Sequence, residues 1–98
     1  MACTLAPQPP RVGLATVTVR LADRSAKAVA GAQINLEGDM AHPGMAPVFA
    51  KAKETEPGRY VAHLQLTMAG DWVILVQATV ANGRKISRQV DVKGVLPG

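Results

Sequence analysis

The chain has 98 residues, of which 48% are hydrophobic and 18% charged, and its formal net charge is +4. This length supports one domain with a modest core, and no apolar run is long enough to span a bilayer. The eleven Lys and Arg residues are scattered from Arg11 to Lys93 without a dense block, which argues against a nucleic-acid partner and favours a solvated basic surface. Weak attraction to an acidic partner or lipid face stays open.

The first segment, residues 1–12, contains the one cysteine, Cys3, and three closely spaced prolines. A single cysteine excludes an intramolecular disulfide, and the prolines predict an extended tether. Met1-Ala2-Cys3 before a proline-rich stretch is typical of the start of a mature bacterial lipoprotein. This favours a periplasmic or extracytoplasmic location, with Cys3 as a candidate lipid anchor. The alternative is a cytoplasmic chain with a free thiol.

Residues 13–93 contain short runs in which apolar and polar side chains alternate, as in half-buried β-strands. The clearest run, 13–21, places Ala15, Val17, Val19 and Leu21 on one face. Pro57-Gly58 predicts a tight turn, and Asn82-Gly83 predicts a hairpin with a type I′ turn. Further strands are predicted over residues 29–37, 48–53, 60–66, 72–80 and 84–93.

No segment has the 3.6-residue apolar period of a helix. Short strands at this spacing predict an all-β domain over residues 13–93, an immunoglobulin-like antiparallel β-sandwich of about seven short strands. An open β-barrel is the alternative architecture. Residues 94–98 are predicted to be a tail.

One stretch, residues 39–47, places Met40, His42 and Met45 around the pair Pro43-Gly44. A type II turn at Pro43-Gly44 brings His42 and Met45 together, and Met40 projects to the same side as His42 in an extended chain. Thioethers prefer Cu(I), and imidazole accepts either copper oxidation state, so the trio predicts a copper site, Cu(I) first and Cu(II) second. The alternative is that the methionines fill gaps at one end of the core.

The predicted strand over residues 60–66 and the residues just after it contain two candidates for a fourth ligand. His63 points away from the face of Tyr60, and Met68 follows the strand. Either residue completes the set if the 40–45 loop folds over that end of the sheet, and the interpretation places His63 slightly ahead. Met68 has the alternative of being a core residue in phase with Leu64 and Leu66.

The motifs Gly38-Asp39-Met40-Ala41-His42-Pro43-Gly44-Met45-Ala46-Pro47, Pro57-Gly58-Arg59-Tyr60 and Met68-Ala69-Gly70-Asp71-Trp72 resemble those of the YtkA-like domain. That domain is related to FixH-type proteins and to modules associated with bacterial copper and heavy-metal efflux. The resemblance extends over about residues 13–93. It implies an immunoglobulin-like sandwich in the cell envelope, copper handling, and Met40, His42 and Met45 as candidate ligands.

Two functions follow. The first is a cell-envelope copper-binding protein, acting as a chaperone, a buffer or an accessory to an oxidase or efflux system. Its partners are a copper ion and a copper-donating or copper-accepting envelope protein; we expect a monomer that meets a membrane only through a lipid anchor. The second is a metal-free immunoglobulin-like structural or docking module that uses Val73 and Leu75. An enzyme is not expected, since no Ser/His/Asp, Cys/His or paired-carboxylate arrangement is apparent.

Overall fold

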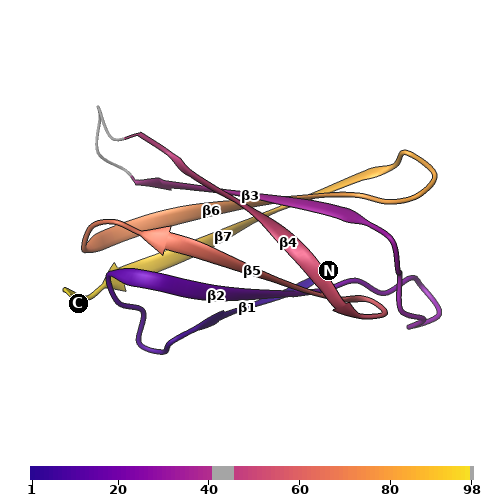
Figure 1. The fold of residues 1–98 in the computed structure, drawn as a ribbon, viewed down its shortest axis with the longest axis horizontal. Coiled ribbons are helices and arrows are strands. Elements are labelled where there is room, and N and C mark those ends of the chain that lie inside the picture. Colours follow the sequence, from indigo (N-terminus) through magenta and orange to yellow (C-terminus); the bar gives the residue numbers. More distant parts are fainter. Residues whose placement is uncertain (41–45, 98) are drawn as a thin grey trace.

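The computed structural model describes residues 1–40 and 46–97, and this part of the chain folds into β-strands without a helix. No helix in it is therefore long and apolar enough to cross a membrane. Seven strands follow one another along the chain (Figure 1): β1 Ala2–Ala6, β2 Gly13–Arg20, β3 Gln33–Met40, β4 Val48–Glu56, β5 Arg59–Leu66, β6 Gly70–Thr79 and β7 Lys85–Val95.

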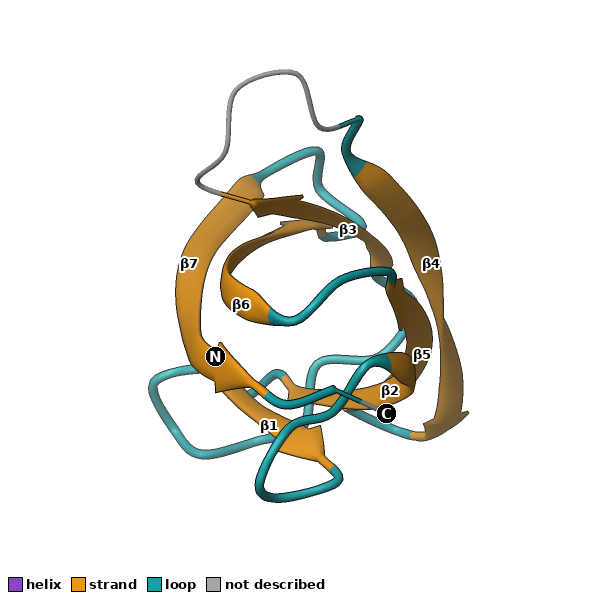
Figure 2. Ribbon diagram, turned by 90° about the vertical axis from the view of Figure 1, so that its left-hand side faces the viewer, coloured by secondary structure: helices purple, strands orange, loops and turns teal. Residues whose placement is uncertain are grey.

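The strands form one antiparallel sheet in the order β1-β2-β5-β4-β3-β6-β7, which folds over on itself into two layers. Strand β4 joins the layers. Its first half, from Val48 to Ala52, pairs with β3, whereas Lys53 to Glu56 pair with β5. The all-β prediction is confirmed, and the sandwich is nearly a closed barrel when viewed along its long axis (Figure 2).

The two end strands of the sheet, β1 and β7, are tied at both ends of the seam between them. At one end, Val12 N donates to Leu96 O over 2.8 Å and Leu96 N donates to Pro10 O over 2.9 Å. At the other end, Arg88 Nη1 donates to Met1 O over 2.6 Å. These contacts hold the barrel almost shut without a continuous ladder between β1 and β7 in the described residues.

The core lies between the layers and consists of the inward side of each alternating strand. The face predicted for β2 is fully inside, with Ala15, Val17, Val19 and Leu21 at most 4% exposed. The other buried apolar side chains come mainly from β3, β5, β6 and β7: Ile34, Leu36, Tyr60, Ala62, Leu64, Leu66, Trp72, Ile74, Val76, Ala78, Val92 and Val95. Period-two alternation therefore reports the buried face correctly on these strands.

The two ends of the chain differ from the prediction. Residues Ala2–Ala6 are not a free tether but form β1, which pairs with β2 from Ala2↔Arg20 to Ala6↔Thr16. Likewise β7 continues through Gly94 to Val95, which is 2% exposed and belongs to the core. The cause is the same in both places: these short apolar segments cover core positions that the neighbouring strand alone leaves open.

The hairpin between β6 and β7 is confirmed, but its turn is not type I′. Such a turn needs positive φ at both central residues, and only Gly83 has it, at +85°. Gly83 N donates to Val80 O, and Val80 N donates to Arg84 O, each over 2.9 Å. This is a three-residue loop with glycine in the left-handed position, and Asn82 stabilises it by accepting a hydrogen bond from Arg84 N.

Candidate metal site

The candidate site lies at the end of the barrel where β3 leads into the β3–β4 connection and where β5 turns into β6 (Figure 1). Met40 is the last residue of β3 and is opposite Trp72 of β6 in the ladder. It has the same inward phase as Ile34, Leu36 and Gly38, and its side chain is partly buried against the core. Met40 therefore covers this end of the core.

Met40 also reaches the β5–β6 turn. An atom at the Cβ position of Gly70 would lie 3.2 Å from Met40 Cε, so the methyl group occupies the space that a side chain at residue 70 would need. Gly70 further has φ of +124°, which favours glycine. The glycine thus permits close contact between the end of β3 and the turn.

Met68 is on that turn, and its side chain is 46% exposed, which excludes the alternative that it belongs to the core. Its main chain is fixed by Trp72, whose Nε1 donates to Met68 O over 2.9 Å. Trp72 is itself 2% exposed. A buried indole thus anchors the turn while the Met68 thioether is left in solvent, two residues from the glycine that Met40 contacts.

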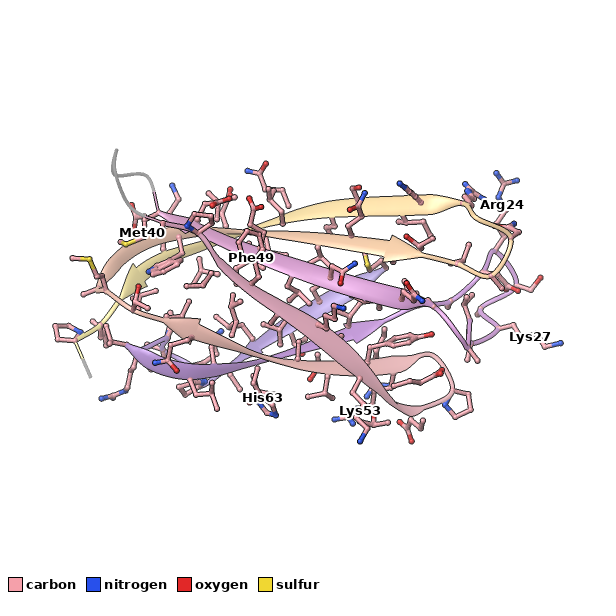
Figure 3. All side chains as sticks on the ribbon, turned by 45° about the horizontal axis from the view of Figure 1, so that its top comes forward. Arg24, Lys27, Met40, Phe49, Lys53 and His63 are labelled. Carbon is pink, nitrogen blue, oxygen red and sulfur yellow. The ribbon has the colours of Figure 1, made fainter. Side chains whose placement is uncertain are left out.

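His63 is in a different place. It lies on the outer side of β5, exposed, with Nδ1 3.3 Å from Thr16 Oγ1 of β2. The labelled side chains in Figure 3 show His63 on the opposite side of the molecule from Met40. Of the predicted ligands, Met40 and Met68 are brought to one end of the barrel and His63 is not. His42 and Met45 lie outside the described residues.

The donors at this end favour a soft metal. Within residues 1–40 and 46–97, no three His, Cys, Asp or Glu side chains gather in a way that would hold a metal ion. Zinc prefers such ligands, whereas Met40 and Met68 offer neutral thioether sulfurs, which suit Cu(I).

Negative charge lies directly beside Met40. The carboxyl groups of Glu37 and Asp39 share the outer side of β3, and hydrogen bonding to Asp39, desolvation and the charge of Asp39 raise the pKa of Glu37. Two neighbouring carboxylates attract cations to this end of the molecule.

Gly70 and Trp72 are the supporting residues that the sequence did not reveal. Both are in the motif Met68-Ala69-Gly70-Asp71-Trp72, but the sequence alone assigns neither of them a part in the site. A possible signal is the spacing Met68-x-x-x-Trp72, which allows an indole N–H to bond the carbonyl at the start of its own turn. Contact between Met40 and Gly70 joins residues 30 positions apart and has no local signal.

The chain was compared with protein families, with curated proteins and with solved structures. The model of the YtkA-like family matches residues 2–77, from β1 into β6 and across the whole candidate site. Neither the curated proteins nor the solved structures yielded a match. The family model matches well over half of the length of this chain, so the chain belongs to the YtkA-like family.

Proposed function

We propose that this protein binds Cu(I) in the cell envelope, with the thioethers of Met40 and Met68 among its ligands. The observation that supports it best is the contact of Met40 with Gly70, which places the end of β3 against the turn that presents Met68. His42 and Met45 follow Met40 within five residues in the sequence and supply one further nitrogen and one further sulfur. Copper is the cargo here, and no substrate bond is made or broken.

Ligand exchange is the mechanism that suits these donors. Thioethers bind without losing a proton, so uptake and release of Cu(I) through them require no proton transfer. Met68 is half-exposed, so a partner protein can approach its sulfur and replace donors one at a time. A role as chaperone, buffer or accessory to an oxidase or efflux system fits such an exposed site.

The test is a titration of the apoprotein with Cu(I) under anaerobic conditions, in competition with a chromogenic chelator. We expect Met40→Leu and Met68→Leu each to weaken the affinity about tenfold or more, equivalent to about 1.4 kcal/mol per factor of ten. His63→Gln is the matched control and should leave the affinity unchanged. Unchanged affinity and stoichiometry in the Met40→Leu/Met68→Leu double variant would contradict the site.

A spectroscopic measurement identifies the ligands directly. The protein has four methionines, so methyl-selective NMR with and without Cu(I) gives four resolvable signals. Shifts at the Met40 and Met68 methyl groups, with Met1 unaffected, support the proposal. Shifts at neither would overturn these two assignments.

The second candidate function is a metal-free docking module. It is favoured by exposed apolar side chains on the outer side of the sheet, where Phe49 is 69% and Leu75 is 40% exposed. The functions differ in one thermodynamic result: Cu(I) that binds only the folded state must raise the Tm. A Tm that does not change with Cu(I) would leave the docking module as the function.

A further inference from the structure

The outer side of β4, β3, β6 and β7 has a shallow groove with apolar walls. The ladder places Glu37 of β3 between Phe49 of β4 and Leu75 of β6. The groove, here named the Phe49–Leu75 groove, is lined among others by Asn35, Glu37, Phe49, Leu75, Gln77 and Gln89. Phe49 is the most exposed large apolar side chain in the described residues. Aromatic side chains are enriched at protein interfaces, and Phe49 and Leu75 expose apolar surface on both sides of Glu37.

Negative charge gathers at the end of this groove nearest the candidate metal site. Asp39 lies on the same side of β3 as Glu37, and the next row of the sheet runs from Asp39 through Val73 to Asp91 of β7. Three of the seven acidic residues are thus within two rows, in a chain whose net charge is +4. The carboxylates are therefore concentrated where the apolar side chains are exposed.

Among the described residues, two cations lie near the groove, Arg88 and Lys51, and neither is opposite Glu37 or Asp39 in the ladder. Arg88 lines the groove, but its guanidinium donates to Met1 O at the β1–β7 seam. Lys51 lies on the same side of β4 as Phe49 and borders the hollow next to it, but it is opposite Asn35, at the end of the groove away from Asp39. The pKa of Glu37 is raised through its hydrogen bond with Asp39, its desolvation and the charge of Asp39. A cation from outside the chain would relieve the repulsion between the carboxylates of Glu37 and Asp39.

We propose that the Phe49–Leu75 groove docks a segment of another protein through an arginine side chain. The aliphatic stem lies across Phe49 and Leu75, and the guanidinium binds Glu37 and Asp39. Arginine fits better than lysine because its planar group stacks on aromatic rings and binds carboxylates through two hydrogen bonds. The same charges repel phosphate groups, so a basic protein is the partner that the charge complements, rather than a nucleic acid or an anionic lipid.

The probe is an acetylated and amidated peptide, Leu-Arg-Ala-Arg-Leu, titrated into the metal-free, ¹⁵N-labelled full chain. The control peptide replaces both arginines with citrulline, which keeps the shape and removes the charge. We expect amide shifts confined to β3, β4, β6 and the facing part of β7, around Glu37, Phe49, Leu75 and Gln89, with the arginine peptide alone. Equal binding of both peptides, no binding, or shifts on other strands would each overturn the proposal.

Variants separate the two parts of the groove. Glu37→Gln/Asp39→Asn should weaken binding of the arginine peptide about fivefold, and Phe49→Ala should also weaken it about fivefold. Glu56→Gln, on the same strand as Phe49 but at its far end, removes a negative charge away from the groove and should have no effect. Equal effects of Glu56→Gln and Glu37→Gln/Asp39→Asn would reduce the result to general electrostatics and overturn the proposal.

The proposal does not depend on copper. The peptide titration is carried out without metal, so its failure leaves the Cu(I) results as they stand, and the reverse is also true. Self-association of the chain through the groove is a further outcome, recognised by shifts that depend on protein concentration without peptide. That outcome would replace the basic partner with a second copy and overturn the proposal as stated.

Discussion

At the scale of single residues, Tyr60 shows how one buried polar group can fix a long connection. Its hydroxyl donates to Val29 O over 2.7 Å and accepts from Ala32 N over 3.1 Å. Both partners are in the segment that leads into β3, about 30 positions earlier in the chain. Tyr60 is 0% exposed, and its two hydrogen bonds to the backbone are part-buried, so both would be lost if the hydroxyl were removed.

Tyr60→Phe should therefore lower the free energy of unfolding by about 1–3 kcal/mol, the net contribution of two hydrogen bonds at about 0.5–1.5 kcal/mol each. Burial is the largest cause that raises the pKa of the Tyr60 hydroxyl. A raised pKa in the folded state means that this contribution is complete below the unfolded-state pKa, about 10, and is lost as the pH rises through the folded-state value.

Urea unfolding of both proteins at neutral pH and at increasing pH above about 10 checks this expectation. The difference in stability between wild type and Tyr60→Phe should shrink as the pH rises. Tyr60 ionises at a lower pH in the unfolded wild type than in the folded wild type, which favours unfolding, and the variant has no such group. A difference that stays constant across this range would show that the hydroxyl is not the titrating group.

At the scale of elements, β1 changes the interpretation of the N-terminus. Cys3 pairs with Val19 in the β1–β2 ladder, and its side chain is partly buried against the core. A lipid on this sulfur would have to be accommodated between β1 and the core, or β1 would have to leave the sheet. The docked position of β1 therefore restricts where a lipid on Cys3 could lie, and the lipid anchor stays a prediction.

The reactivity of Cys3 with a thiol reagent reports whether β1 is docked on the core. Desolvation by burial, only partly offset by the charges of Arg88 and the N-terminus, raises the pKa of the Cys3 thiol. We expect slow modification at neutral pH, which accelerates when Leu5→Asp removes an apolar side chain that holds β1 on the core. Equally fast reactions of native and urea-unfolded protein would show that β1 is not docked.

The individual strands were largely predictable from the sequence, but their partners were not. Alternation identifies the buried face of β2, β5 and β6 because one side of each strand packs on the core. Strand β1 was missed because the prolines that follow it, at positions 7, 9 and 10, suggested a tether, although the five residues before them pair with β2. The transfer of β4 between layers leaves no signal along β4, because pairing depends on strands distant in the chain.

The candidate site was predictable to a similar extent. Met40 and Met68 were recognised by their chemistry, since thioethers outside a regular apolar pattern are conspicuous. The choice between Met68 and His63 depended on which end of the sheet each residue occupies, and period-two alternation gives the face of a strand but not its neighbours. His63 is opposite Thr16 of β2, a contact across 47 residues, which no local pattern could specify.

At the scale of the whole molecule, β4 determines whether the two layers unfold together. It is hydrogen-bonded to β3 from Val48 to Ala52 and to β5 from Lys53 onward, and the core residues of both layers form one cluster. Because no layer has a separate core, neither is expected to remain folded when the other opens. A domain of this size should then unfold in a single two-state transition.

Urea unfolding followed by two probes tests this cooperativity. Fluorescence of the single tryptophan, Trp72, reports the β3–β6–β7 layer, and the rate of Cys3 modification reports the β1–β2–β5 layer, since these residues lie in β6 and β1. Both probes, together with far-UV circular dichroism, should give the same midpoint. A lower midpoint for Cys3 alone would mean that β1 detaches first, and a lower midpoint for Trp72 would mean that the connection through β4 does not couple the layers.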